Sequence, residues 1–540
     1  MHAQPSAEKT GGGKPGAAQP IELPACPTPP EEAGGNWLRQ CFSFLTFLAA
    51  LLTTLVFTMA RRGFGDPDIW WHLRNAEYLF AHHQLPRQDL YSFTAVGSPW
   101  MNHEWLAEIP YYLAWRAGGL RGIKTLEIVL TEAIFLGLLY LCYKSSGNFK
   151  GSVAACCFAV FLGAVSFGPR TILLGYACLV TLLIILERFR RRGSGPLWLI
   201  PPLFCLWVNT HGSWSLGLVV FALVLLGGWV EGRWGRVEAQ RWTPLQWRKL
   251  GLTSLATAPA LLLNPFGYRL LLYPLDLAFR QKLNIAHISE WVSVDFHNPR
   301  GKVVMVLLIG LLLSALLREQ RWTLTELGLV IFALYSGLTY IRFLLFLGIV
   351  VAPVVAKMLD FLPPYRPQID KPLLNALLIG LMVGGVVRYY PTSAALEHSL
   401  AQQYPEELLP FLSSHRLEGR MLNEYLWGGY LGWKERNLKV FIDSRVDLFE
   451  YSGVFQDYLD LLALKAPQSI LDKYRIRYVL FPPDQPLTYA LIHDRGWKVM
   501  AEDRVSVLLE RSGEEAPADA LDFLRAPTFN GGHLQPMEQR

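Results

Sequence analysis

Long apolar runs with almost no charge constrain this chain more than any other feature. Residues 42–60, 303–317 and 373–387 are such runs, and at roughly 15 to 20 positions each is long enough for a tilted helix to cross a bilayer. Apolar residues make up 52% of the 540 residues and charged residues only 17%. This composition predicts an integral membrane protein. It excludes a soluble enzyme, a disordered scaffold and a β-barrel, whose strands would alternate apolar and polar residues.

Clusters of arginine predict how the chain is oriented in the membrane. The basic run 188–192 and the pair Arg318 and Arg321 are expected in the cytoplasm, since positive charge accumulates on that side. An even number of apolar segments lies between them, as two cytoplasmic ends require. We predict about eleven transmembrane helices, with the N-terminus inside, the C-terminus outside, and the helices at residues 42–60, 125–143, 151–167, 171–187, 197–210, 213–230, 250–263, 302–317, 324–340, 342–358 and 372–388.

The remaining segments complete the predicted domain organisation. Residues 1–36 are expected to form a disordered cytoplasmic tail, and residues 37–388 a transmembrane domain. Its first outer loop is 61–124, in which the aromatic, partly charged stretch 104–118 suits an interfacial helix better than a span. The net charge of +6 is spread over short loops, so no nucleic-acid partner is expected. The seven cysteines lie in the tail or in apolar helices, which makes disulfides and cysteine-bound zinc improbable.

After residue 388 the composition becomes that of a soluble domain. Apolar runs at 439–442, 478–481 and 505–509 predict strands, and the patterns near 405–414, 453–465 and 486–494 predict helices. We therefore expect a small extracytoplasmic α/β domain over residues 389–511, followed by a flexible tail over 512–540.

The first outer loop carries the residues best suited to catalysis or ligand binding. It contains DPDIWWHL (66–73), LPRQD (85–89), YSFT (91–94) and WMNHEWL (100–106), with four of the twelve histidines of the chain. Carboxylates beside aromatic rings at a membrane surface can act as a general base or hold a divalent cation, and tryptophan rings suit sugar faces. The alternative is a tryptophan belt at the interface with aspartates that cap helices.

These motifs resemble a known family. Acidic residues after the first span, an amphipathic outer loop, many helices and an outer α/β domain resemble the C-type glycosyltransferase superfamily of polyprenyl-phosphate-dependent enzymes. The motifs listed above, together with WVNTHG (207–212), NPFG (264–267), SEW (289–291), WGGY (427–430) and IDSRVD (442–447), look more like a bacterial group of glycosyltransferase-like membrane proteins. The resemblance covers about residues 40–510.

The resemblance implies transfer of a sugar from a polyprenyl-phosphate lipid to a lipid, glycan or protein acceptor on the outer side of a bacterial inner membrane. An aspartate of the first outer loop, Asp66 or Asp68, would be the base, although Pro67 between them departs from the simpler family pattern. The leaving phosphate requires positive charge near the outer leaflet. The predicted phosphate-binding residues are Arg342, His211, Arg170 and Arg74, and the predicted acceptor or sugar contacts are His72, Trp71, Asp89, His103 and Glu104.

Several readings stay open from the sequence alone. A divalent cation held by Asp66, Asp68, His103 and Glu104 is a weaker expectation, since the ligands lack compact spacing, and no other cofactor is expected. The alternating Asp443, Arg445 and Asp447 suggest a sugar-binding edge or, more simply, a salt-bridge cluster. A transporter or flippase of a lipid-linked saccharide is the main rival function, although no internal repeat supports it. A non-enzymatic envelope assembly protein is the other.

Overall fold

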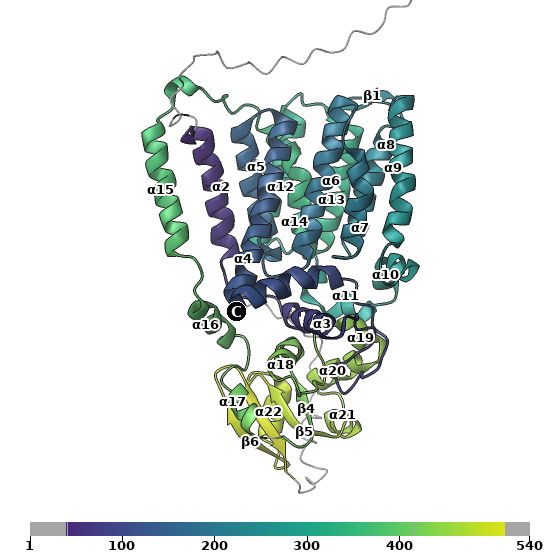
Figure 1. Cartoon of the computed structure of the whole chain (residues 1–540), viewed down its shortest axis with the longest axis vertical. Coiled ribbons are helices and arrows are strands. Elements are labelled where there is room, and N and C mark those ends of the chain that lie inside the picture. The colour runs from purple at the N-terminus through teal and green to yellow at the C-terminus, as the bar shows by residue number, and fades with distance from the viewer. Residues whose placement is uncertain (1–38, 40, 416, 513–540) are drawn as a thin grey trace, which may run out of the picture.

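A computed structural model describes residues 39, 41–415 and 417–512 of the chain. The helices of the apolar part run side by side as one bundle, and the strands of the C-terminal region lie beyond its lower end (Figure 1). Shorter helices from the first and the later loops lie between these two parts. The predicted tails over 1–36 and 512–540 fall outside the described residues, apart from Ser512.

Each of the eleven predicted spans contains a helix. Among the described residues, five helical stretches are long and apolar enough to cross a membrane, and a sixth is added if the bent pair of α15 and α16 counts as one span. The protein is therefore a multi-pass helical membrane protein, while the count of about eleven spans stays a prediction. The bundle helices are α2 (Phe44–Ala60), α4 (Trp105–Ser146), α5 (Phe149–Gly163), α6 (Ile172–Arg192), α7 (Ile200–Val208), α8 (Trp214–Gly227), α9 (Pro244–Leu262), α12 (Pro299–Leu317), α13 (Leu324–Thr339), α14 (Leu344–Met358) and α15 (Pro372–Arg388).

Helix α14 lies at the centre of the bundle, and almost all of its side chains are buried. Small residues allow its neighbours to approach closely, as is usual where helices pack within a membrane. A Cβ atom at Gly348 would lie 3.3 Å from Ala159 of α5, and one at Gly163 would lie 2.4 Å from Leu345. Larger side chains at either glycine would push these helices apart.

Helix α4 is broken near its N-terminal end. Gly118 and Gly119 have non-helical backbone angles, and Gly119 has a positive φ of 56°, which a glycine adopts without strain. An unbroken helix of its 42 residues would extend about 63 Å, twice the thickness of a hydrocarbon core. The break lets the first segment, residues 105–117, lie across the lower end of the bundle while the rest crosses it (Figure 1). This agrees with an interfacial helix over 104–118.

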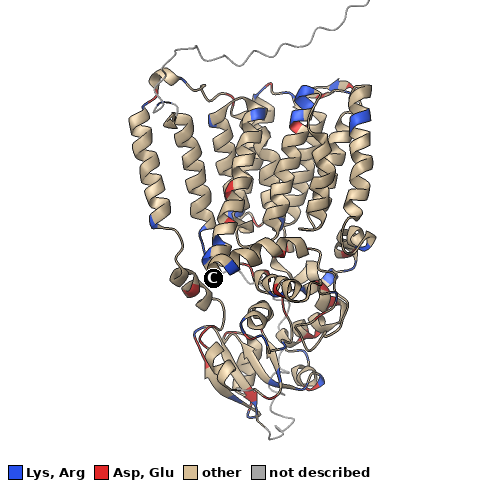
Figure 2. Ribbon diagram, viewed as in Figure 1, with Lys and Arg blue, Asp and Glu red and all other residues tan. Residues whose placement is uncertain are grey.

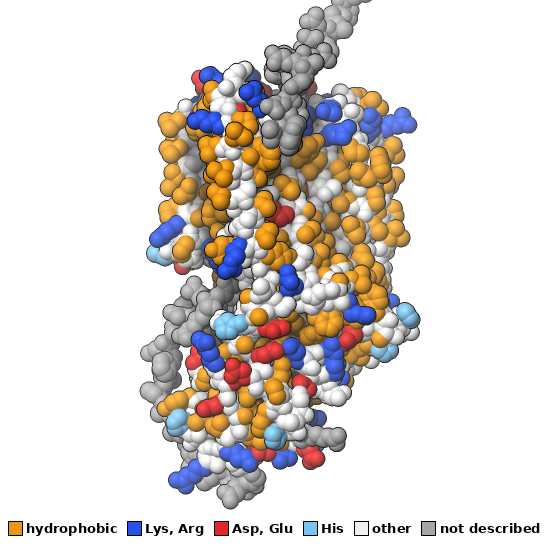
Figure 3. All heavy atoms as spheres, turned by 60° about the vertical axis from the view of Figure 1, so that its left-hand side comes forward, with side chains coloured by type: hydrophobic (Ala, Val, Ile, Leu, Met, Phe, Trp, Pro, Cys, Tyr) orange, Lys and Arg blue, Asp and Glu red, His pale blue; other side chains and the backbone are white. Residues whose placement is uncertain are grey.

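Charged residues of the bundle gather toward its ends, whereas its flank is hydrophobic (Figure 2 and Figure 3). Lysines and arginines lie at the upper end of the bundle, away from the C-terminal sheet, and also at its lower end (Figure 2), and hydrophobic side chains cover its flank (Figure 3). At the upper end Arg190 of α6 pairs with Glu187 at 2.9 Å and with Glu326 of α13 at 3.4 Å. A small sheet of β1 (Gly232–Trp234), β2 (Val237–Ala239) and β3 (Trp322–Thr323) joins loops there. The predicted orientation stays a prediction.

The C-terminal region contains a four-stranded mixed sheet in the order β4-β5-β7-β6. Strand β4 (Arg420–Asn423) pairs in parallel with β5 (Ile476–Phe481), and β7 (Val507–Arg511) is antiparallel to both β5 and β6 (Trp497–Glu502). Around it are α16 (Ser393–Ala401), α17 (Leu409–Ser414), α18 (Gly428–Lys434), α19 (Val446–Tyr451), α20 (Val454–Leu462), α21 (Pro467–Lys473) and α22 (Pro486–Ile492). The mixed α/β architecture confirms the prediction.

One predicted strand is wrong. Residues 439–442 form no strand of the sheet, and within them only Val440 makes a bridge, to Ser92 of the first outer loop. The run is apolar because Val440, Phe441 and Ile442 are buried, between the sheet domain and that loop. The partner of this segment is thus the loop, which lies some 350 residues earlier.

Candidate functional site

Most of the predicted site residues meet at the junction between the bundle and the C-terminal region. Helix α3 (Asp68–His82) begins directly after the turn that follows α2, and it lies below the bundle near the first segment of α4 (Figure 1). The loop between α7 and α8, the turn η3 (Ser289–Trp291) and the turn η4 (Ile341–Phe343) bring further polar residues to the same place. Helices α10 (Tyr268–Phe279) and α11 (Lys282–His287) precede η3.

Asp66 is held by two contacts at the start of α3. One of its carboxylate oxygens accepts a hydrogen bond from the backbone N–H of Asp68 at 2.8 Å, a turn that aspartate commonly forms. The other oxygen forms an ion pair with Arg170, which lies two residues before α6. Arg170 also pairs with Glu290 of η3. The guanidinium of Arg170 therefore joins two carboxylates that lie far apart in the sequence.

Asp68 is partly buried beside Asp66, and this environment changes its acidity. Burial, followed by the negative charge of Asp66, raises the pKa of Asp68 to about 7, although the nearby His72 acts in the opposite direction. The indole N–H of Trp71 donates to Asp68 at 3.2 Å and lies 3.1 Å from the hydroxyl of Ser444 in the C-terminal region. A carboxylate with a pKa near neutrality is well suited to general base catalysis.

His72 is buried between two glutamates. Its Nδ1 lies 3.0 Å from Glu108 and its Nε2 lies 3.3 Å from Glu104. Burial by itself lowers the pKa of His72, but hydrogen bonds to both glutamates outweigh it and raise the pKa to about 10. Glu108 also accepts hydrogen bonds from the side-chain amides of Asn75 and Asn102, both at 2.9 Å. His72 is thus a charged member of a buried polar network.

Glu104 also contacts His103 and His211, so that three imidazoles surround it. The Nε2 atoms of these two rings lie 3.5 and 3.3 Å from one oxygen of Glu104. Nδ1 of His211 accepts a hydrogen bond from the backbone N–H of Ser213 at 2.9 Å, which leaves the ring proton on Nε2 when the ring is neutral. Burial lowers the pKa of His211 to about 4, with Glu104 opposing and Arg342 assisting the shift. His211 is therefore a neutral hydrogen-bond donor near pH 7.

Arg342 differs from Arg170 in its surroundings. It lies in η4, at the lower ends of α13 and α14, with its guanidinium 4.2 Å from the ring centre of Trp291. No ion pair or side-chain hydrogen bond of this guanidinium is seen among the described residues. Burial raises the pKa of the neighbouring Glu290, whereas Arg170 and then Arg342 lower it, and the net shift is downward. The charge of Arg342 is thus near the site without a carboxylate bound to it.

Two predicted residues do not join this group. Arg74 donates to the carbonyl oxygens of Gly432 and Arg436, the latter at 2.8 Å. Asp89 is fully buried and pairs with Arg445 at 2.6 Å. Both residues connect the first outer loop to the C-terminal region instead of lining the site around Asp66 and Asp68.

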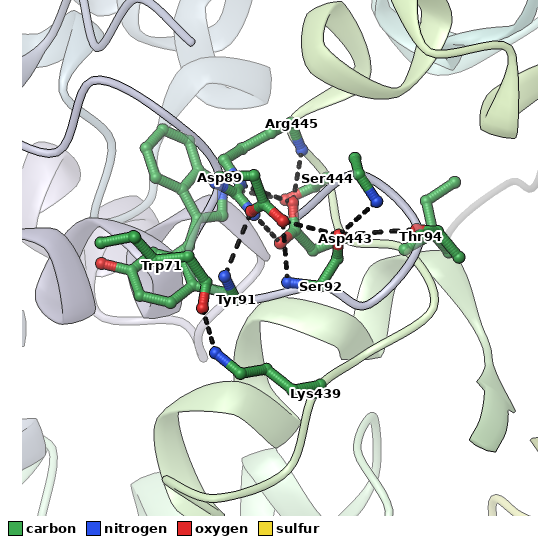
Figure 4. Close-up of polar contacts among 12 residues, drawn as sticks. Trp71, Asp89, Tyr91, Ser92, Thr94, Lys439, Asp443, Ser444 and Arg445 are labelled. Carbon is green, nitrogen blue, oxygen red and sulfur yellow. Dashed lines mark hydrogen bonds and ion pairs between the residues drawn. The ribbon is translucent and has the colours of Figure 1, made fainter. Parts of the chain in front are cut away.

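The contact between this loop and the segment 443–445 is a salt-bridge cluster (Figure 4). Arg445 pairs with Asp443 at 2.7 Å as well as with Asp89, and the hydroxyl of Ser92 donates to Asp89 at 2.6 Å. The simpler of the two sequence interpretations is therefore correct for Asp443 and Arg445. Asp447 is separate, and its carboxylate accepts a hydrogen bond from Tyr273 at 3.4 Å.

The described residues form no evident metal centre. Across 39, 41–415 and 417–512, no group of three or more histidine, cysteine, aspartate or glutamate side chains is arranged to hold a metal ion. Of the four expected ligands, Asp66 is bound to Arg170 and Glu104 to three imidazoles. His103 also packs on the ring of Tyr273, with ring centroids 4.3 Å apart.

Sequence reasoning missed Glu290 as a member of the site. Its motif, Ser289-Glu-Trp291, was visible in the sequence, but nothing there indicated that it contacts Arg170, 120 residues earlier. Ser444 was missed as a partner of Trp71 for the same reason. Opposite charges in two predicted outer loops are the signal in the sequence that could have suggested the contact.

Two solved structures are similar to this chain over most of its length. No known family profile and no curated protein matches the sequence. The crystal structure of the Archaeoglobus fulgidus oligosaccharyltransferase, tethered with an acceptor peptide containing the NVT sequon, is similar over 90% of this chain and 75% of that one, with a TM-score of 0.49 and 14% identity. That of ArnT from Cupriavidus metallidurans, bound to undecaprenyl phosphate, is similar over 87% of this chain and 98% of that one, with a TM-score of 0.45 and 12% identity.

Proposed function

We propose that the protein is a membrane glycosyltransferase that moves a sugar from a polyprenyl-phosphate donor to an acceptor on the outer side of the membrane, with Asp68 as the base. The observation that carries this proposal is the pair of aspartates at the end of the first helix. Asp66 is neutralised by Arg170, whereas in the part of the chain that the structure describes no cation is bound to Asp68, whose pKa is raised to about 7. Of the two, only Asp68 has the properties of a base near neutral pH.

The reaction requires a proton acceptor and an anion site close together. The acceptor hydroxyl gives its proton to Asp68 as its oxygen bonds to the anomeric carbon. The bond from that carbon to the phosphate oxygen breaks, and the lipid phosphate leaves with the electron pair. We assign the phosphate to Arg342, since its guanidinium holds no carboxylate among the described residues, and not to His211, whose Nε2–H already faces the carboxylate of Glu104 at 3.3 Å.

Arg170 has a different role in this proposal. Because two carboxylates already bind its guanidinium, we infer that it positions Asp66 and Glu290 and that it does not bind the donor phosphate. The outer face follows from the predicted orientation, in which the arginine-rich ends of the helices lie in the cytoplasm and the C-terminal region lies outside. Headgroup depth on that side is where a lipid phosphate and an outer acceptor can meet.

Transfer of a radiolabelled sugar in proteoliposomes tests the proposal. Purified protein would be given a panel of polyprenyl-phosphate monosaccharides and an envelope extract as the source of acceptor. Asp68→Asn keeps the shape of the side chain but cannot accept a proton, so it should lower transfer by about 10²-fold or more. Asp484→Asn, an exposed aspartate of the C-terminal region, is the matched control and should transfer at the wild-type rate.

The same vesicles separate this proposal from the transporter reading. A flippase would move the labelled lipid between leaflets without forming a sugar–acceptor bond. Translocation by the wild type without transfer from any donor of the panel, and unaffected by Asp68→Asn, would refute the glycosyltransferase assignment.

A further inference from the structure

One acidic side chain lies inside a membrane-spanning helix without a basic partner. Glu132 belongs to the long part of α4 that follows the break at Gly118 and Gly119. Its atom Oε2 is buried, and no hydrogen-bond partner for this oxygen is found among the described residues. The side chain lies against α2, where the backbone N–H of Phe57 is the polar group that interacts with it. This contact leaves the carboxyl group without a counter-charge.

The other acids in the comparable helices each bind a basic side chain. The pairs are Glu127 with Lys124 in α4, Glu187 with Arg190 in α6, and Glu326 of α13 with Lys357 of α14. Burial of a carboxyl group in this bundle is thus normally accompanied by a cation. In the part of the chain that the structure describes, Glu132 departs from that pattern.

Aromatic and basic side chains at both ends of this part of α4 place Glu132 near the middle of the membrane. The guanidinium of Arg121 lies 5.7 Å from the ring centre of Tyr390 at one end, and the ammonium of Lys144 lies 5.6 Å from that of Tyr140 at the other. Such side chains are typical of the two membrane interfaces. Glu132 is 11 residues after Arg121 and 12 before Lys144, about 17 and 18 Å along a helix. Because a hydrocarbon core is about 30 Å thick, Glu132 lies near its centre.

Glu132 borders an exposed, otherwise apolar face of α4. Val129, Leu136 and Tyr140 are 56%, 44% and 48% exposed. They lie three, four and eight residues from Glu132, which places all four on one side of the helix. We call these four residues the Glu132 face. An ionisable group at this depth is costly unless it is paired, and lipid tails provide no partner for it.

We propose that the Glu132 face binds a transmembrane helix of a different membrane protein, one that carries a lysine or arginine near the middle of its span. This inference is independent of the proposed function. Polar side chains pair across helices within a membrane, and a cation at matching depth provides the charge that Glu132 lacks. The exposed apolar residues on either side of Glu132 provide the surface on which such a helix packs.

Neither a second copy of this chain nor a phospholipid provides the required charge. In the described bundle helices, every lysine and arginine lies within about two turns of a helix end or of the break in α4. A second Glu132 would bring another carboxyl group to the same depth. The amine of a phospholipid headgroup lies at the interface, roughly 15 Å from the membrane centre. The occupant is therefore a helix with a basic residue in mid-span.

Site-directed photocrosslinking in native membranes tests the proposal. A photoreactive amino acid replaces Val129, and the matched control carries it in place of Val306, which is 61% exposed on α12. Position 129 should give an adduct with a protein whose spanning helix has a lysine or arginine near its middle, and position 306 should not. Glu132→Leu should lower the yield by about tenfold or more, whereas Glu132→Asp, which retains the charge, should keep it.

The folding of Glu132→Leu is checked by its size-exclusion profile and thermal unfolding. Leucine is favoured at this membrane depth, so the variant should match the wild type in both measurements. A loss of the adduct in a folded variant then reports the missing carboxyl group.

A designed helix provides a second measurement with a known ligand. A polyleucine transmembrane peptide with one central lysine would be reconstituted with the full chain that carries the photoreactive residue at position 129. It should crosslink about tenfold more than the same peptide with a central leucine, and Glu132→Leu should abolish the difference. Equal crosslinking of the two peptides would overturn the proposal. So would the absence of a protein adduct in native membranes, an adduct that survives Glu132→Leu, one with a second copy of this chain, or one with a protein that has no basic residue in mid-span.

Discussion

Removing the charge of Asp66 should shift the pH dependence of sugar transfer. Asp68 acts as a base only when it is ionised, so transfer should rise with pH through its pKa of about 7. The charge of Asp66 is, after burial, the main cause of that raised pKa. Asp66→Asn removes this charge and also frees part of the Arg170 guanidinium, and both changes favour ionised Asp68. The acid limb of the profile should therefore move to lower pH.

The size of the effect can be worked out from the titration of one group. With a pKa of about 7, roughly one tenth of Asp68 is ionised at pH 6 and nine tenths at pH 8, so the ratio of transfer rates at these pH values should be about 0.1. A single charge at a partly open site is worth about one pKa unit, or ~1.4 kcal/mol. Such a shift would raise the ratio in Asp66→Asn to about 0.5.

The assay is kcat/KM for transfer in proteoliposomes between pH 5.5 and 8.5, because this parameter reports the ionisation of the free enzyme. The ratio within each variant is compared, so a general loss of activity in Asp66→Asn does not affect the result. An acid limb of the pH profile that moves to higher pH or stays in place in Asp66→Asn would refute the electrostatic argument. An unchanged limb in the residual activity of Asp68→Asn would show that another group is the base.

Three further predictions concern the two arginines and the topology. Arg342→Gln should raise the apparent donor requirement in the transfer assay while expression stays near normal, because no carboxylate loses its partner; wild-type donor use would remove Arg342 from the phosphate site. Arg170→Gln should instead destabilise the protein by roughly 2–4 kcal/mol in denaturation measurements, since it leaves Asp66 and Glu290 unpaired, and an unchanged stability would contradict the bridging role. The predicted topology places the C-terminal region outside the cytoplasm, so alkaline phosphatase fused after Arg511 should be active. A fluorescent protein that matures only in the cytoplasm should be dark at the same position, and the reverse pattern would show that the predicted topology is inverted.

The positions of the bundle helices were predictable because hydrophobicity along a membrane helix is a local property. Every predicted apolar range contains a helix, and the partly charged stretch before residue 118 was recognised as unsuited to a span. The strand predicted at 439–442 failed because an apolar run indicates burial but does not identify what buries it.

The sequence by itself determined that the protein lies in a membrane, that two aspartates follow the first helix, and that charged residues occur near particular helix ends. Only the tertiary structure decided which of those charged side chains form ion pairs within the protein. Arg170 and Arg342 both lie near helix ends in the sequence, yet Arg170 bridges Asp66 and Glu290 while Arg342 contacts the ring of Trp291. The partners of Arg170 are more than 100 residues away in the chain. Electrostatic interactions depend on distance in space, and the packing of many helices and loops sets that distance.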